Sequence, residues 1–483
     1  MKILVKRTSI QISPYNEENR CETLETGLSV YNQDYFRLDP IGYDYRPETE
    51  TLIIPRSVSL RVLENTFNCP VTIDRTHDEI EKARIKLNSE PRNDLQRKAI
   101  AFLLGKGEYE DIATHSRLML ELDTGIGKTY CAIAAISYMK VKGAIILNSK
   151  KLMAQWKDKL QEYTNLSDKE IYTVAGSASI DRIMKGKCEK CKIFLVSHNT
   201  VTTYANKHGW DSITELFQKM KIGVKVFDEA HQRLANTIMI DLYTNTKRTY
   251  YLTATAERSN YRENKLFIRV YGPVPILSVK RNKEQAYVKS IVLNYDSSPS
   301  FSDQGLLKNK HGMNVNRYID YMVFGRARAK FYKCLGIILN TVLPREGTIA
   351  ILLGRKKAVA DVAIYIKKNF SEFADEVGIF TSDVKDKDER VEQLKKKIIL
   401  TTFKSFGTGI DLDDKLRAVV MCEPYSSKVT LHQTIGRLRQ VEGADLYYFE
   451  LVDTGVKQRV RQFESIKNEL LKSSEKVTSF NIP

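Results

Sequence analysis

The chain has 483 residues, a formal net charge of +17 and an isoelectric point near 9.3. No apolar run approaches the roughly twenty residues of a membrane span, and the N-terminus lacks the apolar core of a signal peptide. Seven scattered cysteines fit a reducing compartment, so we expect a soluble, intracellular protein without a membrane partner. The length allows about three domains, and the basic excess favours a polyanionic partner, although a solvated basic surface would give the same excess.

Residues 1–88 are the first predicted domain, a small α+β accessory unit. Met1–Thr8 and Thr51–Arg56 have strand-like patterns, and Ser57–Phe67 has a helical pattern. Lysine and arginine in these elements would suit contacts with phosphate groups. The alternative is a domain that only packs against the lobe that follows.

Apolar strands alternate with amphipathic helices through residues 89–275, which is the pattern of a parallel sheet covered by helices. This range is the first predicted α/β lobe, with an apolar helix at Tyr130–Ile136. Its expected strands are Arg117–Leu122, Val141–Leu147, Lys192–Ser197, Ile222–Phe227 and Thr249–Thr253.

A phosphate-binding loop is expected between the first strand and that helix. Gly125, Gly127, Lys128 and Thr129 supply its glycines, lysine and hydroxyl, whereas Leu122 stands where the full pattern asks for glycine. The glycines let backbone N–H groups face phosphate oxygens, the lysine reaches the outer phosphates, and the threonine hydroxyl ligates Mg²⁺. The sequence therefore predicts that the chain binds ATP with magnesium.

An acidic pair, Asp228 and Glu229, ends the apolar run Ile222–Phe227. Asp228 is expected to hold Mg²⁺ through water, and Glu229 to orient and deprotonate the attacking water. Such a pair alone could be a helix N-cap. Together with Lys128 it predicts hydrolysis of the nucleotide.

One C-x-x-C motif is formed by Cys188 and Cys191. A structural zinc ion needs two more ligands, and the sequence has no second C-x-x-C or paired histidines. We expect a surface turn between a helix and a strand here.

A second alternating series predicts another α/β lobe at residues 326–455, and both lobes belong to the α/β class. Residues 276–325 are polar and rich in turn residues, so they are expected to be a connector, and residues 456–483 a C-terminal helix and tail. The expected strands of the second lobe are Thr348–Leu353, Val377–Phe380, Lys397–Thr401, Ala418–Cys422 and Tyr447–Leu451.

Two sequence runs of the second lobe contain residues that could take part in the chemistry. Phe406–Asp411 contains glycines that let backbone approach a phosphate, and Gln433–Arg439 is expected at a helix start. An arginine from this lobe can stabilise the charge that develops on a triphosphate, and Arg437 is predicted for that role. Taken singly, each run could also be a turn or a helix surface.

The motifs in this order resemble those of DEAH-box superfamily 2 helicases over residues 88–455, which implies two RecA-like lobes. The resemblance is carried by Pro91–Gln96, the phosphate loop, Leu152–Lys157, Ser197–Thr200, the acid box at 228–231, Leu252–Ala256, Gly354-Arg355 and the two runs above. Gln155-Trp156 and Gln433–Arg437 are most similar to phage UvsW-type branch-migration helicases and their XPB-like and poxviral relatives. This resemblance favours a phage or viral origin, for which we expect the protein in the host cytoplasm.

This resemblance implies a role for each matching residue. Catalysis is assigned to Lys128, Glu229, Gln433, Arg437 and Arg439; the family usually has a further arginine where this chain has Gln440, so Arg439 either replaces it or Arg437 works alone. Nucleotide contacts are assigned to Gln96, Thr124, Gly125, Gly127, Gly409 and Asp411, and metal binding to Thr129 and Asp228. Strand contacts are assigned to Gln155, Trp156, Ser197, His198, Arg355, Thr402 and Lys404, and coupling between the lobes to His231, Thr253 and Thr255.

The implied function is ATP-driven movement on branched, duplex or single-stranded DNA, as in branch migration, fork regression or R-loop removal during replication, recombination or repair. One alternative is a remodeller that releases proteins or transcripts from DNA without unwinding it. Another is a catalytically silent scaffold for replication, recombination or transcription proteins. RNA also remains open as a substrate, because phosphate contacts alone do not read the 2′-hydroxyl.

Overall fold

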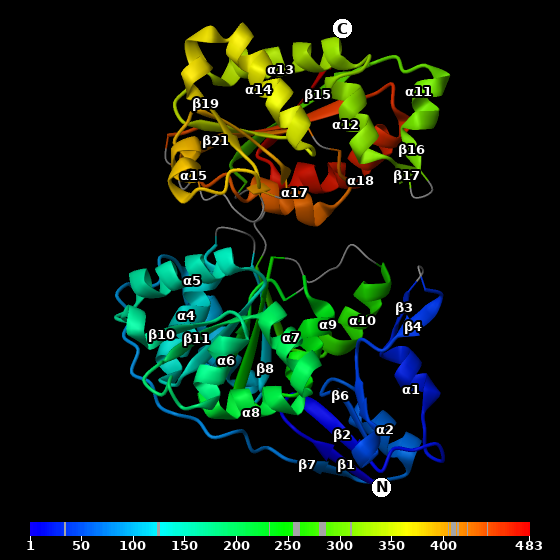
Figure 1. Ribbon diagram of the computed structural model, residues 1–483, viewed down its shortest axis with the longest axis vertical. Coiled ribbons are helices and arrows are strands. Elements are labelled where there is room, and N and C mark those ends of the chain that lie inside the picture. The colour runs from blue at the N-terminus through cyan, green and yellow to red at the C-terminus, as the bar shows by residue number, and fades with distance from the viewer. Residues whose placement is uncertain are drawn as a thin grey trace. The chain divides into compact units, whose positions relative to one another are not determined.

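The computed structural model describes residues 1–32, 35–122, 126–230, 232–254, 261–279, 286–309, 312–403, 405–406, 412, 415–422, 424–441 and 443–483. Its helices and strands group into two compact units, Met1–Lys280 and Arg281–Pro483. Figure 1 shows the helices and strands of both units.

The N-terminal part of the first unit is an α+β domain, as predicted. Its five-stranded sheet has the order β5-β6-β2-β1-β7, in which only the pair β1 and β7 is parallel. The elements are β1 (Lys2–Val5), β2 (Ser9–Ser13), α1 (Glu22–Gly27), β3 (Val30–Asn32), β4 (Arg37–Asp39), β5 (Asp44–Arg46), β6 (Thr51–Pro55), α2 (Leu60–Phe67) and β7 (Val71–Ile73).

Lobe 1 follows as a seven-stranded, wholly parallel sheet with the order β10-β11-β9-β12-β13-β8-β14 in the described residues. Most of its strands are buried on both faces, which explains their continuous apolar sequences. The strands are β8 (Arg117–Leu122), β9 (Gly143–Leu147), β10 (Ile171–Val174), β11 (Ile193–Ser197), β12 (Val224–Phe227), β13 (Arg248–Thr253) and β14 (Ile276–Val279).

Helices cover both faces of this sheet (Figure 1). Asn93 and Ser149 begin α3 and α5 by accepting hydrogen bonds from Gln96 N and Leu152 N at 2.9 and 3.2 Å. One face packs on α3 (Asp94–Leu104), α4 (Lys128–Met139) and α5 (Lys150–Tyr163). The other packs on α6 (Ser177–Met184), α7 (His198–His208), α8 (Asp211–Met220), α9 (Leu234–Leu242) and α10 (Tyr261–Tyr271), and shares its core with the N-terminal domain.

Lobe 2 has a second wholly parallel sheet of seven strands in its described residues, with the order β19-β20-β18-β21-β22-β15-β23. The strands are β15 (Val288–Tyr295), β18 (Thr348–Leu352), β19 (Val377–Phe380), β20 (Ile398–Thr401), β21 (Leu416–Met421), β22 (Leu446–Asp453) and β23 (Lys476–Ile482). Its helices include α11 (Phe301–Leu306), α12 (Val315–Val323), α13 (Arg328–Val342), α14 (Lys356–Asn369), α15 (Lys387–Leu394), α17 (Lys428–Ile435) and α18 (Lys457–Ser473).

The structure differs from three expectations about organisation. The range 276–325 was expected to be a connector, yet β14 pairs with β8 and β15 pairs with β22, so its ends complete the two sheets. The C-terminal segment contains the expected helix but also β23, which pairs with β15. Gln433–Arg439 lies at the end of α17 rather than its start, because Ser427 caps that helix by accepting a hydrogen bond from Thr430 N at 3.3 Å.

The C-x-x-C motif also differs from its prediction. Cys188 and Cys191 lie in and beside a turn after α6, but both are buried, because they pack in the core that includes Ile180 and Phe194. Within the described ranges no group of three or more His, Cys, Asp and Glu residues is arranged to hold a metal ion. None of the described helices has the length and apolar character needed to cross a membrane.

Candidate nucleotide site

The candidate site lies where neighbouring parallel strands of lobe 1 end. Strand β13 lies between β12 and β8, with Phe227 beside Tyr251 and Thr253 beside Glu121. The acidic pair follows β12, and the phosphate loop follows β8. Because the carboxyl ends of parallel strands meet at one edge, this edge is where such folds bind their ligands.

The phosphate loop is described from Ile126 onward, whereas Thr124 and Gly125 lie outside the described residues. Gly127 has a φ of +107°, in the left-handed region that favours glycine, and α4 begins directly after it. The Lys128 Nζ donates a hydrogen bond to the carbonyl oxygen of Leu122 at 2.7 Å. The ammonium group therefore lies beside the last residue of β8.

Gln96 joins the phosphate loop to the segment before α3. Its Nε2 donates to the carbonyl oxygen of Ile126 at 2.9 Å, and its Oε1 accepts from Arg92 N at 2.9 Å. The side chain is buried, and its Nε2 would lie 2.5 Å from a Cβ added to Gly127. Gln96 therefore supports the loop directly, in addition to the nucleotide contact predicted for it.

Asp228 is the buried acid of the site. Its Oδ2 accepts a hydrogen bond from the Trp156 indole Nε1 at 2.8 Å, and its Oδ1 accepts from Glu229 N at 3.1 Å. Burial and then the neighbouring charge of Glu229 raise the pKa of Asp228 to about 6, while Trp156 and Lys128 oppose that rise. Two acidic side chains and the Thr129 hydroxyl offer the hard oxygen donors that suit Mg²⁺, which takes only one or two carboxylates beside phosphates and water.

Glu229 adopts an unusual backbone conformation, with a φ of +50°. A non-glycine residue rarely occupies this region, and such strained residues gather at functional sites. The turn redirects the chain after β12, so that Gln232 N donates to Glu229 O at 2.9 Å and Ala230 N donates to Leu252 O at 3.0 Å. The acid box is thereby tied to β13.

Two predicted strand contacts of lobe 1 require correction. Trp156 is 2% exposed and His198 is 1% exposed, so neither ring lies on the surface of the lobe. Trp156 instead supports Asp228 from α5. His198 packs against Phe227, with ring centroids 5.9 Å apart, and burial lowers its pKa to about 3, which keeps the ring neutral.

The other predicted residues of lobe 1 are placed as follows. Ser197 is buried and caps α7, where its hydroxyl accepts from Thr200 N at 3.4 Å. Gln155 is partly exposed on α5, and Thr253 is buried at the end of β13. His231 and Thr255 lie outside the described residues.

The predicted residues of lobe 2 form a separate group. Arg355 begins α14 and forms an ion pair with Asp320, and the Thr402 hydroxyl donates to Ser405 Oγ at 2.9 Å. Gln433 lies in the last turn of α17, and Arg437 and Arg439 follow that helix. Lys404, Gly409 and Asp411 lie outside the described residues.

A buried charge pair fixes the framework beneath α17. Arg459 on α18 and Glu450 on β22 are 1% and 0% exposed, and they form an ion pair that Tyr448 joins by donating to Glu450. At the surface, His432 and Glu469 connect α17 to α18 at 3.1 Å. These contacts position the segment that carries Arg437.

Comparison with known proteins adds family information to this geometry. A family model described as the type III restriction enzyme res subunit matches residues 88–258, which include the phosphate loop and the acidic pair. The "DNA 3'-5' translocase XPB2" of Sulfurisphaera tokodaii is 24% identical over 376 residues, covering 70% of this chain and 78% of that protein. These matches support a superfamily 2 helicase that resembles the XPB proteins. The helicase is therefore an enzyme that uses nucleotide.

Further matches agree with this placement of the helicase. The "DNA 3'-5' helicase XPB" of Kineococcus radiotolerans is 27% identical over 152 residues, which is 32% of this chain and 25% of that protein. The structure of the restriction-modification enzyme LlaBIII bound to DNA matches with a TM-score of 0.56 and 14% identity, over 82% of this chain and 32% of that one. Dbp5 of S. cerevisiae, bound to RNA and ADP BeF3, matches with a TM-score of 0.51 and 15% identity, over 80% and 89%. These two structures share the fold of paired RecA-like lobes.

Proposed function

We propose that this helicase hydrolyses ATP with Mg²⁺ and uses the energy to move along DNA. The observation that carries the proposal is the meeting of Lys128 with Asp228 and Glu229 at one edge of the lobe 1 sheet, with Asp228 held by Trp156 at 2.8 Å. DNA as the track is supported by the names of the relatives, which are DNA translocases and helicases of 3'-5' direction. We extend that direction to this chain.

The residues divide the hydrolysis between them. Lys128 neutralises the outer phosphates. Thr129 and Asp228 would hold Mg²⁺, which would supply further neutralisation of phosphate charge. Glu229 orients the attacking water and accepts its proton. The positive charge of Arg437, or of the nearby Arg439, stabilises the negative charge that develops on the phosphates in the transition state. Hydrolysis then depends on lobe 2.

We propose branched or duplex DNA in phage or viral replication, recombination or repair as the setting. Branch migration, fork regression and R-loop removal all require a motor that follows a backbone without reading its sequence. Gln155, Arg355, Thr402 and Lys404 remain our candidates for strand contacts, whereas Ser197 is buried and caps α7. Phosphate contacts give affinity that is independent of sequence. Thr253, with His231 and Thr255, remains our candidate for coupling the nucleotide to movement.

Steady-state ATP hydrolysis is the test, measured alone and with single-stranded DNA, duplex DNA, a four-way junction and RNA in parallel. We expect the strongest stimulation by the junction, and displacement from partial duplexes with a 3' overhang rather than a 5' overhang. Stimulation by duplex alone without strand displacement would favour the remodeller. If no condition gives hydrolysis, the result would favour the catalytically silent scaffold.

Matched variants locate the chemistry. Lys128→Ala and Glu229→Gln should each abolish turnover, with Glu229→Gln retaining nucleotide affinity, whereas Lys219→Ala removes an exposed lysine of α8 and should change nothing. Arg437→Ala should lower hydrolysis more than nucleotide binding. If Arg437→Ala leaves turnover intact and Arg439→Ala does not, the charge comes from Arg439.

A further inference from the structure

A second cluster of cations lies at the edge of the lobe 1 sheet opposite the nucleotide site. Arg117 begins β8 and Arg248 begins β13, whereas Leu122 and Thr253 end the same two strands at the nucleotide site. Strands of this length span roughly 17 to 20 Å. The two groups of positive charge are therefore separate places in one lobe.

The cluster surrounds a cavity of about 900 Å³ between the N-terminal domain and lobe 1. Its volume falls in the range of small-ligand pockets. Asp74 is the one carboxylate among the described residues that line it. The N-terminal domain contributes Arg7, Arg56 and Arg75 to its wall, and lobe 1 contributes Arg117, Lys247 and Arg248.

Two arginine residues in this wall are more than nine-tenths buried. Arg248 and Arg117 are each 8% exposed. Arg117 donates to the Ser57 hydroxyl at 3.2 Å from both of its terminal nitrogens, and Arg248 Nη2 donates to Ala113 O. Arg248 Nη1 is buried and finds no hydrogen-bond partner within the described part of the chain. A buried charged donor in that condition is costly unless a ligand satisfies it.

The cations also repel one another. Burial lowers the pKa of Arg248, burial and the charge of Arg117 lower that of Arg56, and burial and the charge of Arg248 lower that of Arg7. Among the described residues, neither Arg56, Arg117 nor Arg248 forms an ion pair that would offset this repulsion. An anion in the cavity would remove the repulsion and pair the buried donors at once.

We propose that this cavity is a second anion site, which binds a phosphate group small enough to enter between the N-terminal domain and lobe 1. Arg117 and Arg248 provide planar guanidinium groups that match phosphate oxygens, and Arg56 adds charge at the wall. Two sources have this chemistry, a free oligophosphate and the terminal phosphate of a nucleic-acid strand. A phosphate inside a strand is flanked by sugars on both sides and fits such a cavity less well.

Calorimetric titration with inorganic tripolyphosphate tests the site, in full-length protein carrying Lys128→Ala so that the phosphate loop does not contribute. We expect one bound tripolyphosphate per chain, and an affinity lowered roughly tenfold to a hundredfold by Arg56→Gln or Arg248→Gln. Arg61→Gln is the matched control, because Arg61 is exposed on α2 and does not line the cavity. In the described structure the Arg56 side chain makes no hydrogen bond, so we expect Arg56→Gln to fold. The test therefore remains valid if Arg248→Gln unfolds.

Equal affinity in the Arg56 and Arg61 variants would overturn the proposal, and so would the loss of all binding on Lys128→Ala alone. Competition then separates the sources. Displacement of tripolyphosphate by a short strand with a 5'-phosphate, but not by the same strand with a 5'-hydroxyl, identifies a strand end. Displacement by neither identifies a free oligophosphate. Because binding is measured without hydrolysis, failure here leaves the proposed ATPase function untouched.

Discussion

Trp156 donates its indole N–H to Asp228 at 2.8 Å, although the two residues are 72 positions apart in the chain. The contact joins α5 to the end of β12 and is buried, so no water replaces it. A hydrogen bond to a charged group is worth about 1.5–3 kcal/mol. Trp156 is thus a positioning residue for the acid that we assign to the metal ion.

Trp156→Phe removes this donor and keeps an aromatic ring. We expect the Mg²⁺ concentration needed for half-maximal hydrolysis to rise roughly tenfold or more, because Asp228 loses the bond that orients it. Trp210→Phe is the control, since Trp210 is the second of two tryptophans and stacks on Tyr243 away from the site. An unchanged Mg²⁺ dependence in Trp156→Phe would show that the contact is only structural.

Asp228 also predicts a pH dependence of stability in the metal-free protein. Its pKa is raised from 3.8 to about 6 by burial and by Glu229, so its charged form weakens the fold. A group whose pKa is raised in the folded state stabilises the fold at a pH below its unfolded-state pKa. That contribution is lost as the pH rises through its folded-state pKa. Stability from this residue should therefore fall between about pH 4 and pH 6, by an amount on the order of 2–3 kcal/mol.

Asp228→Asn isolates this effect, because asparagine does not titrate. The free energy of unfolding of the variant, relative to the wild type, should increase with pH across that window when measured in urea with a chelator present. The hydrogen bond that asparagine loses lowers its stability equally at each pH and does not change the slope. A flat difference between pH 4 and pH 7 would contradict the raised pKa.

Much of the fold was predictable, because strands buried on both faces of a parallel sheet have continuous apolar sequences. β8, β12 and β18 were found in this way. β15 was missed because its exposure varies along the strand and its partner β22 lies far along the chain, and β23 because it is a mostly exposed strand at the edge of the sheet. Such pairing leaves no local signal in the sequence.

The residues of the candidate nucleotide site could be picked out from the sequence where a motif has a fixed spacing. The residues around Lys128 and around Asp228 form motifs of this kind. The parallel strands bring the two motifs to one edge of the sheet. The role of Trp156 had no such signal, since a tryptophan on an amphipathic helix is equally suited to the surface and to the core. Its burial against Asp228 depends on tertiary packing alone, as does the burial of His198.

Gly127→Ala should disturb the phosphate loop through a steric clash with Gln96, in addition to backbone strain. The new methyl group would lie 2.5 Å from Gln96 Nε2, so Gln96 must release Ile126 O. Gly176→Ala is a matched control, because Gly176 has a similar φ of +105° but no atom within 4 Å of its added Cβ. Both variants carry a backbone cost of about 1–3 kcal/mol. Only Gly127→Ala should lower nucleotide affinity, roughly tenfold or more by calorimetry; equal affinities would exclude the Gln96 contact.

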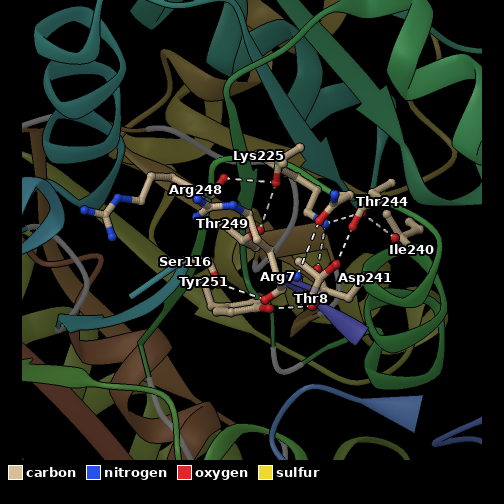
Figure 2. A network of polar contacts seen from close by, with 12 residues as sticks. Arg7, Thr8, Ser116, Lys225, Ile240, Asp241, Thr244, Arg248, Thr249 and Tyr251 are labelled. Atoms are coloured by element: carbon tan, nitrogen blue, oxygen red, sulfur yellow. Dashed lines mark hydrogen bonds and ion pairs between the residues drawn. The ribbon is translucent and has the colours of Figure 1, made fainter. Parts of the chain in front are cut away.

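A buried ion pair below the acid box gives the last prediction. Lys225 on β12 and Asp241 on α9 lie 2.7 Å apart with side chains 0% and 6% exposed, and Lys225 also donates to Thr244 (Figure 2). Tyr251 on β13 donates to the same aspartate, and Thr8 of the N-terminal domain donates to Thr244 O. The network therefore joins the N-terminal domain to the two strands that end at the acid box.

Lys225→Met should lower the free energy of unfolding by about 3–5 kcal/mol, because it leaves Asp241 charged and buried without a counterion. Adding Asp241→Asn should restore part of that loss, since the amide can still accept from Tyr251. Lys159→Met, which breaks an exposed pair with Glu162, should cost less than about 1 kcal/mol in the same urea titration. If Lys225→Met costs no more than Lys159→Met, the buried pair does not stabilise the lobe, and the connection from the N-terminal domain to the acid box must lie elsewhere.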